Sequence, residues 1–131
     1  MASRETVFTK EVLKRHGARP DLRIWRNETA GAWVGKMKGR TPSGDVVLRK
    51  GARMIQAGLC KGSADLIGLT SDGRFIALEL KVGRDRLRKD QAQFLKFIES
   101  FGGIAGSART MEEVDQILGV PPGESDGGAE N

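Results

Sequence analysis

Apolar and polar residues alternate along residues 74–81, which is the pattern of a β-strand with one buried face. Glu79 and Lys81 fall on the face opposite the large aliphatic residues. Residues 62–69 end in a nearly continuous apolar run, as in a strand that is covered on both sides. Residues 70–73 (Thr-Ser-Asp-Gly) have the composition of a tight turn. The pattern therefore predicts a β-hairpin made of these two strands.

The periodicities of strands and helices predict that the rest of residues 1–118 belongs to the same single domain. Residues 36–61 are Gly-rich and basic, and they predict only short strands and loops. Residues 119–131 hold three acidic residues and no basic one, and they predict a disordered tail. Helical spacing occurs in residues 5–15, 87–101 and 110–118, and strand patterns occur in residues 22–26 and 104–108.

The length of the hairpin loop decides which side chains meet across the two strands. A loop of three residues pairs Thr70 with Arg74, which places Asp65 opposite Glu79 and Lys81 on the same face. A two-residue turn would shift the pairing by one residue and separate the two carboxylates, unless a bulge restored the register. The three-residue loop is the register that we expect.

Two carboxylates and a lysine on a largely buried hairpin are costly unless something offsets the like charges. The usual remedies are a raised pKa, an internal ion pair or a bound metal cation. Two hard oxygen ligands suit Mg²⁺ or Mn²⁺, and a lysine beside the metal can orient or deprotonate an attacking water. A simple Glu79–Lys81 ion pair on a solvated sheet face is the alternative interpretation of the same residues.

Other kinds of catalytic site are excluded by composition. The chain has one histidine, His16, and one cysteine, Cys60, so it has no zinc finger, no separate Cys–His nucleophile motif and no internal disulfide. Residues 62–65 are not followed by Gly-Lys-Ser/Thr, which excludes a phosphate-binding P-loop.

The charge is unevenly distributed over the 131 residues. Residues 1–118 hold all 22 Lys and Arg but 14 of the 17 acidic residues, a net charge of +8. A body this basic favours a polyanionic partner such as nucleic acid. The chain shows no 18-residue apolar run and no cleavable signal, so we expect a cytoplasmic location.

Three motifs together resemble the VRR-NUC domain, the virus-type replication–repair nuclease branch of the PD-(D/E)XK superfamily. They are GSADLIG at residues 62–68, GRFIALELK at residues 73–81 and QAQFL at residues 91–95. The similarity runs from residue 5 to about residue 118 and includes residues 24–27 and 102–105. Two positions depart from the pattern: Ala64 replaces the usual proline, and Arg88 stands where a serine often caps the next helix.

The resemblance implies an α/β PD-(D/E)XK restriction-endonuclease-like core, a mixed sheet flanked by helices, and metal-dependent cleavage of branched or flapped DNA. Lys81 would be the catalytic lysine, and Gln91 would match the glutamine of the helix that follows the catalytic strand. Glu11 is a rival to the N-terminal acid Glu5, which on residue patterns alone is simply an acid favoured by the helix dipole. The implied ligands of Mg²⁺ or Mn²⁺ are Glu5, Asp65, Glu79 and the backbone carbonyl of Leu80.

Candidate DNA contacts include the basic cluster that directly follows Lys81, although such a cluster can also be a solvated run of charge. Of the two tryptophans, we expect Trp25 to lie in the core and Trp33, between glycines, to be exposed for stacking on bases. The full set of candidates is Arg26, Asn27, Trp33, Lys36, Lys38, Arg53, Ser63, Arg84, Arg86, Arg88 and Lys89.

The activity expected from these features is that of a phage-type Holliday-junction resolvase acting as a homodimer in a bacterial or phage-infected cell. The dimer rests on the family resemblance, since two sites could cut opposing strands of a four-way junction. A monomeric flap or nicking endonuclease is the alternative enzyme. A catalytically silent DNA-binding module and a small basic scaffold protein are the alternatives without catalysis.

Overall fold

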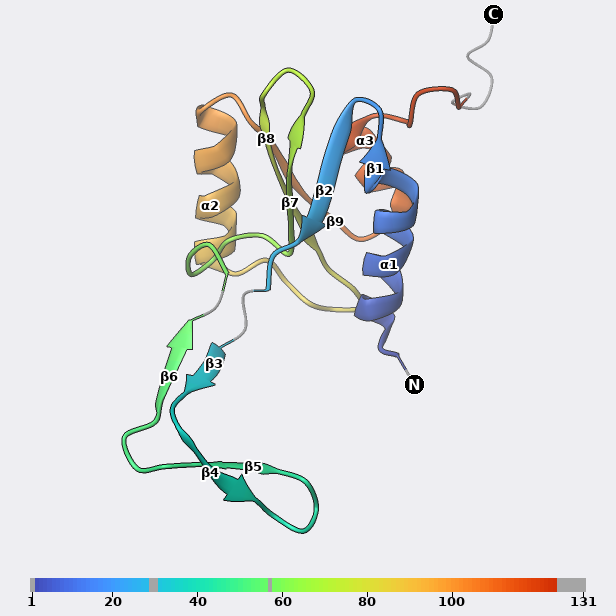
Figure 1. Ribbon diagram of the computed structural model, residues 1–131. Helices are drawn as coiled ribbons and strands as arrows, with labels where there is room; N and C mark the ends of the chain where they lie inside the picture. The colour runs from blue at the N-terminus through green and yellow to red at the C-terminus, as the bar shows by residue number, and fades with distance from the viewer. Residues whose placement is uncertain (1, 29–30, 57, 125–131) are drawn as a thin grey trace, which may run out of the picture.

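The computed structural model describes residues 2–28, 31–56 and 58–124 and shows a mixed α/β fold (Figure 1). The main sheet has the strand order β1-β2-β7-β8-β9, with β8 and β9 parallel and the other neighbours antiparallel. The predicted fold class, a mixed sheet flanked by helices, is confirmed. Its elements are α1 (Arg4–His16), β1 (Ala18–Arg19), β2 (Leu22–Arg26), β7 (Leu66–Thr70), β8 (Phe75–Leu80), α2 (Lys89–Ser100), β9 (Ile104–Ala108) and α3 (Met111–Leu118).

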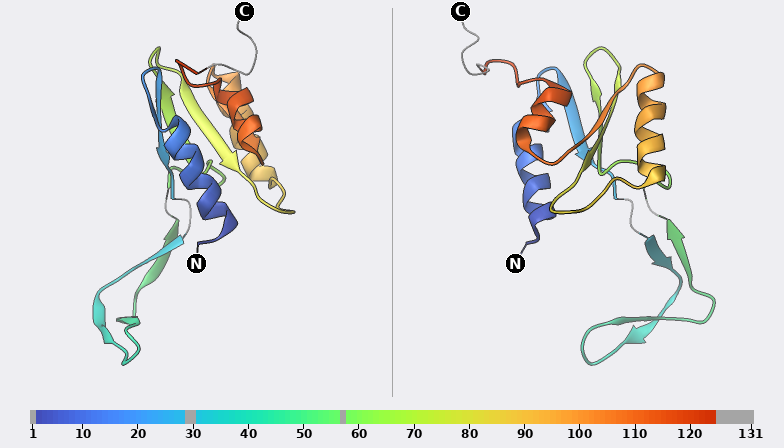
Figure 2. Two further views of the ribbon diagram at one scale, coloured as in Figure 1. Left: turned by 90° about the vertical axis from the view of Figure 1, so that its right-hand side faces the viewer. Right: turned by 180° about the vertical axis from the view of Figure 1, so that it is seen from behind.

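Apolar side chains are buried on both faces of the sheet, because successive residues of a strand point in opposite directions. Figure 2 shows, in its right-hand view, α1 and α3 on one side of the sheet and α2 on the other. Each fully buried Leu or Ile contributes about 1.5–3 kcal/mol, so the central strand β8 is firmly held. The larger core comprises Val12, Leu22, Ile24, Leu66, Ile76, Leu78, Leu80, Ala108, Val114 and Leu118, and the smaller one, under α2, comprises Ala64, Ala77, Leu95 and Ile98.

Strand β7 is shorter than the predicted strand over residues 62–69. Gly62 has a φ of +84°, a left-handed conformation that suits glycine, and residues 62–65 form a loop that leads into the strand. Farther along β7, Gly68 has no room for a side chain, since a Cβ there would overlap the carbonyl oxygen of Arg23 on β2. Glycine is therefore needed where β2 and β7 approach each other.

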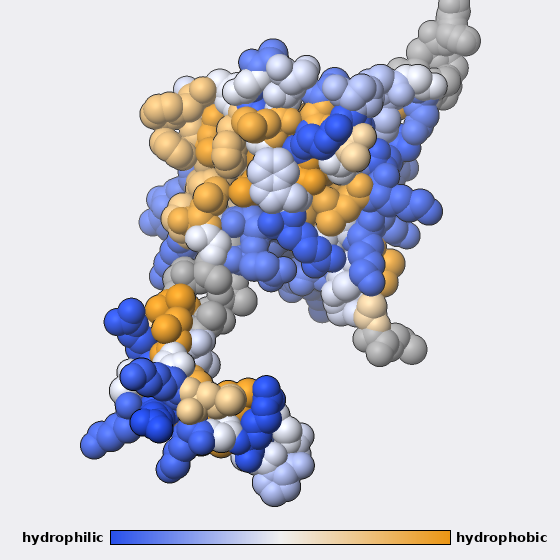
Figure 3. Space-filling view, viewed as in Figure 1, coloured by the Kyte–Doolittle hydropathy of each residue, from blue (hydrophilic) through white to orange (hydrophobic). Residues whose placement is uncertain are grey.

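The prediction that Trp25 lies in the core is wrong. Trp25 is 47% exposed, and Leu69 on the neighbouring strand is 48% exposed. Both lie on the face of the sheet that α2 covers, but α2 packs over β8 and β9 and leaves β2 and β7 open. Figure 3 shows apolar residues gathered on this open face. Trp33, by contrast, is 62% exposed, as predicted.

Residues 31–56 form an extension, here called the arm, that projects from one end of the core (Figure 1). It contains two small antiparallel sheets, one pairing β3 with β6 and one pairing β4 with β5. The short strands predicted between residues 36 and 61 are thus present. The bounds are β3 (Gly31–Val34), β4 (Met37–Arg40), β5 (Val46–Leu48) and β6 (Arg53–Gln56).

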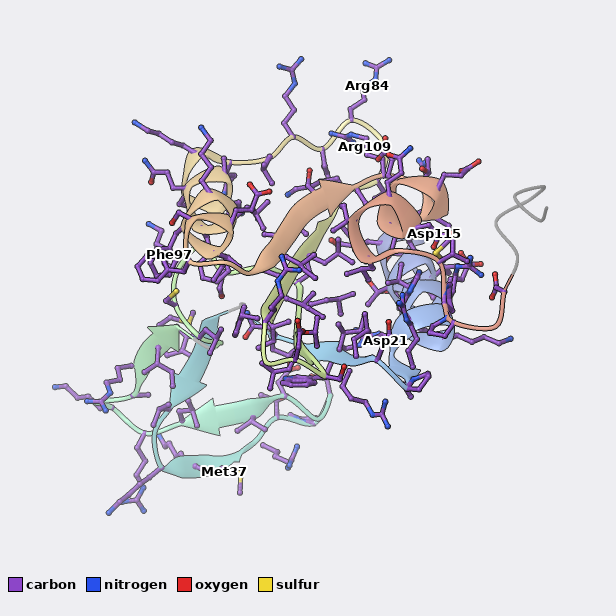
Figure 4. The ribbon with its side chains drawn as sticks, turned by 90° about the horizontal axis from the view of Figure 1, so that it is seen from above. Asp21, Met37, Arg84, Phe97, Arg109 and Asp115 are labelled. Atoms are coloured by element: carbon purple, nitrogen blue, oxygen red, sulfur yellow. The ribbon has the colours of Figure 1, made fainter. Side chains whose placement is uncertain are left out.

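A buried histidine joins α1 to α3. The His16 ring is 0% exposed; its Nε2 lies 2.8 Å from Asp115 Oδ1, and its Nδ1 lies 2.9 Å from Arg19 Nη1. Because Arg19 can only donate, Nδ1 must accept, and Nε2 then carries the single proton of a neutral ring. Asp115, labelled in Figure 4, also takes a bidentate pair from Arg15. The network is complete only with a neutral histidine.

We expect His16 to make the fold weaken as the pH falls below about 6.5. Burial lowers the pKa of the His16 imidazole below its usual value, although Asp115 opposes the shift. The unfolded chain therefore binds a proton that the folded chain resists, and stability falls by up to about 1.4 kcal/mol per pH unit. In urea unfolding between pH 7.5 and 5, the stability of the parent relative to His16→Gln should fall with this slope, because every other group that titrates in this range is common to both proteins. Equal slopes would contradict the prediction.

The ends of the chain complete the description. Glu124 forms an ion pair with Arg15 at 2.8 Å. Residues 125–131, the greater part of the predicted disordered tail, lie outside the described residues. Across the described ranges, no helix combines the length and the apolar character needed to cross a membrane.

Candidate active site

The β7–β8 hairpin has the predicted register. The backbone N–H of Thr70 donates to the carbonyl of Arg74 at 2.9 Å, which closes a three-residue loop, and Leu66 pairs with Leu78 at the other end. One residue beyond the Leu66–Leu78 pair, Asp65 lies opposite Glu79. The two-residue turn is thereby excluded.

The two carboxylates are fixed by the ends of the strands that carry them. Asp65 N–H donates to Glu79 Oε1 at 3.2 Å, and Leu80 N–H donates to Asp65 Oδ2 at 3.0 Å. Each carboxylate therefore accepts, with one oxygen, a backbone hydrogen bond from the segment that carries the other acid. Lys81 follows on the same face, as predicted, with Nζ 3.4 Å from Glu79 Oε2 and a side chain that is 12% exposed.

Glu79 is buried, with only 2% of its surface exposed. Burial and the neighbouring negative charge of Asp65 raise its pKa to about 7, against the opposing effect of Lys81. Gln91, 6% exposed in the first turn of α2, donates from Nε2 to Glu79 Oε2 at 2.9 Å. At neutral pH this site therefore holds a carboxyl group that is poised between its charged and neutral forms.

Gln91 also caps the start of its own helix. Its Oε1 accepts from the backbone N–H of Arg88 at 2.9 Å, which is the glutamine half of a capping box. An arginine side chain has no acceptor, so Arg88 cannot supply the serine-type half. Helix α2 accordingly starts at Lys89, two residues later than the predicted helix, and one glutamine links that start to Glu79.

Gln91→Ala should destabilise the fold by about 1–3 kcal/mol, because it removes the closer donor to a buried carboxylate oxygen and the acceptor that caps α2. Gln93→Ala is the matched control, since Gln93 lies on the same helix but is exposed. Urea unfolding of both variants at pH 8 measures the difference. Equal losses would show that the Gln91–Glu79 hydrogen bond contributes nothing.

A cavity of about 430 Å³ opens beside Asp65 at the end of the sheet. Helix α1 begins here: Ser3 caps it by accepting from Thr6 N–H, and the first turn brings Glu5 to the cavity wall. The rival acid Glu11 faces a different depression, which it lines with Arg109. The residues lining the cavity are Glu5, Thr6, Thr9, Arg26, Asn27, Glu28, Asp65 and Arg88.

The donor set suits a hard divalent cation. Asp65 and Glu79 present carboxylate oxygens at one point, and burial, together with the charge of Asp65, raises the pKa of Glu79 because both disfavour its negative charge. A cation would offset this repulsion. Over the described part of the chain, no three His, Cys, Asp or Glu side chains are grouped closely enough to hold a metal ion. Glu5 shares the cavity with Asp65 without completing such a group.

Asn27 ties the base of the arm to the loop that carries Asp65. Its backbone N–H donates to the Asp65 carbonyl at 2.8 Å. Its Nδ2 donates to Ser63 Oγ and to the Ala64 carbonyl, both at 2.8 Å, and its Oδ1 accepts from Leu59 N–H at 3.2 Å. Asn27 and Ser63, two of the predicted DNA contacts, are 8% and 3% exposed and make these internal bonds.

The other predicted DNA contacts fall into three groups. Arg26 and Arg88 line the cavity, and Lys89 and Arg88 line an adjacent depression. Arg84 and Arg86 are exposed on the loop after β8, where Figure 4 shows Arg84 pointing outward. The rest, Trp33, Lys36, Lys38 and Arg53, belong to the arm.

The sequence analysis missed three residues of the cavity: Thr6, Thr9 and Glu28. Glu28 had a usable signal, because it directly follows Asn27, the residue that continues the β2–β7 pairing to Asp65. Thr6 and Thr9 had none, since a threonine near the start of a helix usually hydrogen-bonds within the helix itself. Thr9 does so here, donating to the Glu5 carbonyl at 2.8 Å.

Comparison with known proteins gives one family. Residues 45–112, just over half of the chain, match the family described as the VRR-NUC domain. The matched range includes the whole β7–β8 hairpin, α2 and β9. No curated protein matches the chain.

Proposed function

Since the chain belongs to the VRR-NUC domain family, whose members are nucleases, we propose that it is a metal-dependent, structure-selective DNA endonuclease. The observation that carries the proposal is the meeting of Asp65, Glu79 and Lys81 at one end of the β7–β8 hairpin, with Asp65 also lining the cavity. A merely structural ion pair needs one acid and one base. Here a second acid, the partly buried Asp65, adds a like charge that a bound cation would offset.

Asp65 and Glu79 would hold Mg²⁺ or Mn²⁺, with Glu5 and the backbone carbonyl of Leu80 as further ligands. The bound cation would act as a Lewis acid and lower the pKa of a coordinated water. Gln91 keeps the Glu79 carboxylate in place through its amide. The β7–β8 backbone hydrogen bonds keep Asp65 in place, so the ligands need little reorganisation when the substrate arrives.

Lys81 would act on the phosphate and the attacking water. Its ammonium group lies beside Glu79, where it can orient the water and offset the charge that grows on the phosphate oxygens. Water adds to phosphorus, and the bond from phosphorus to the 3′ oxygen breaks. The products would be a 5′-phosphate and, once the departing oxygen takes up a proton, a 3′-hydroxyl.

Arg26 and Arg88 on the cavity wall would bind the phosphates on either side of the scissile bond, with Arg84, Arg86 and Lys89 farther along the backbone. Such contacts position DNA without reading bases. Selectivity for a branched structure, above all a four-way junction, follows the family pattern, as does a homodimer with two sites.

Cleavage of a labelled DNA panel tests the proposal. Duplex, flap, fork and four-way junction are incubated with Mg²⁺, Mn²⁺ or EDTA, and the products are compared in length and end chemistry. Metal-dependent cutting with paired nicks across the junction supports a resolvase, and cutting of the flap alone indicates a flap endonuclease. Tight binding without cutting under either metal would contradict a nuclease and indicate a silent DNA-binding module.

A further inference from the structure

The arm, residues 31–56, carries the net charge of the whole chain. It contains six Lys or Arg and one Asp, a net charge of +5, whereas basic and acidic residues are equal in number over the rest of the sequence. Within the described residues none of the six arm cations makes an ion pair. A local excess of unpaired positive charge favours a polyanion.

The arm also exposes large apolar side chains between its cations. Exposed fractions reach 62% at Trp33, 56% at Met37 and 55% at Met54. Figure 3 shows apolar and charged residues intermingled along this extension. A two-stranded β-ribbon is marginally stable in water by itself, because it has no second layer to bury its apolar face. Its surface therefore suits a partner that binds cations and also contacts apolar side chains.

The base of the arm is part of the candidate active site. Arg26, Asn27 and Glu28 line the cavity beside Asp65, and the chain enters the arm directly after them. Figure 1 shows the arm leaving the core at the end where α1 and α2 begin and β8 stops. DNA bound in the cavity would therefore continue toward the arm.

We propose that the arm is a DNA-binding ribbon that lies in a groove of the duplex next to the segment held in the cavity. The inference rests on the proposed function and adds a second contact region to it. DNA grooves admit two-stranded β-ribbons, and ribbons that bind DNA combine cations for the phosphates with apolar side chains that insert between base pairs. Extended to its limit, a ribbon of this length reaches about 40 Å, roughly one turn of duplex.

A second copy of this chain is the competing occupant of the apolar surface. Charge argues against it, because two arms would bring two net charges of +5 together. The open sheet face around Trp25 is no better a partner for an arm, since Arg23 is exposed on the same face of β2. DNA complements both the charge and the shape of the ribbon.

The test compares short and long DNA in EDTA, where binding is measured without cutting. A hairpin of about 8 base pairs spans only the cavity, and a duplex of about 30 base pairs also reaches the arm. The arm variant is Lys36→Gln/Lys38→Gln/Arg53→Gln. The control is Lys14→Gln/Arg74→Gln/Lys96→Gln. It also removes two lysines and one arginine, but from exposed positions on the core.

On the long duplex, the arm variant should bind at least about tenfold more weakly, and its salt slope should fall by about 3, one for each phosphate that the variant no longer neutralises. On the short hairpin it should match the parent, and the control should match the parent on both. In a Trp25→Phe background, Trp33 is the only tryptophan, and its fluorescence should change with the long duplex alone.

The contrary results separate the two proposals. If the parent cuts DNA with metal but the arm variant binds long duplex as tightly as the parent, the arm inference fails and the nuclease stands. Equal losses on both lengths would place the arm's cations at the cavity. A change in molar mass by light scattering, with unchanged DNA binding, would assign the arm to self-association. A parent that neither binds nor cuts DNA overturns the proposed function as well.

Discussion

Lys81→Ala should reduce cleavage by at least about 1,000-fold while leaving metal binding and DNA binding largely intact. The side chain is not part of the oxygen donor set, and the cations that would bind flanking phosphates lie elsewhere, on the cavity wall and the loop after β8. What the variant loses is the ammonium group that orients water and offsets phosphate charge. Single-turnover cleavage of the preferred panel substrate measures the loss.

Lys96→Ala is the matched control for this experiment, because Lys96 is an exposed lysine on α2 outside the site. It should cleave at the parent rate. Titration with Mn²⁺ and a DNA-binding curve for Lys81→Ala complete the comparison. A variant that cuts within tenfold of the parent would remove Lys81 from the reaction and leave the Glu79–Lys81 pair as a structural contact.

Glu79→Gln should remove a pH dependence of stability from the metal-free protein and should weaken metal binding. Without metal, the Glu79 carboxyl has a pKa of about 7 in the fold and about 4.5 in the unfolded chain. Its contribution to stability is therefore complete below pH 4.5 and is lost as the pH rises through 7, about 3 kcal/mol in all. The amide of Glu79→Gln does not titrate, so the stability of the variant should lack this pH dependence, although its NH₂ group faces a donor in place of an accepting oxygen.

With metal the parent should gain more stability than the variants. A cation bound to the native state raises the parent's melting temperature, whereas Glu79→Gln and Asp65→Asn bind the cation more weakly and gain less. Thermal unfolding at pH 5 and pH 8, with Mg²⁺ or EDTA, gives both comparisons. Glu99→Gln, an exposed change on α2, should follow the parent throughout.

Two results would contradict this assignment. The first is an equal pH dependence of stability in the parent and Glu79→Gln without metal, which would mean that the carboxyl is not poised by burial and Asp65. The second is an equal metal affinity in the parent, Lys81→Ala, Asp65→Asn and Glu79→Gln, which would remove the division between ligands and catalytic lysine.

The hairpin and its register could be predicted because they depend on local sequence. Turn composition located the loop but left two lengths open, and the expected three-residue loop, with the period of two, placed Asp65 opposite Glu79. The cavity is different, because α1, β2 and α2 meet there from distant parts of the chain. Glu28 lines the cavity because these segments meet there, and the sequence alone did not predict it.

The exposure of Trp25 was mispredicted for a related cause. An apolar position on a strand indicates only that one face is buried, and whether a helix covers that face depends on where the helix packs. Helix α2 covers β8 and β9, so a residue on β2 with a core-like pattern stays in water. The arm illustrates the same limit, because its sequence predicts short strands but not that they leave the core.

The Asn27 hydrogen bonds make the arm a replaceable segment. They hold residue 27 against residues 59, 63, 64 and 65, so the chain leaves the core and returns to it at nearly the same place. The sheet does not need the arm to keep its register, and doubling the length of a loop closed in this way costs only about 0.6 kcal/mol. Arms of other lengths and charges could therefore be exchanged on one unchanged catalytic core, which would let substrate preference diverge while the chemistry stays fixed.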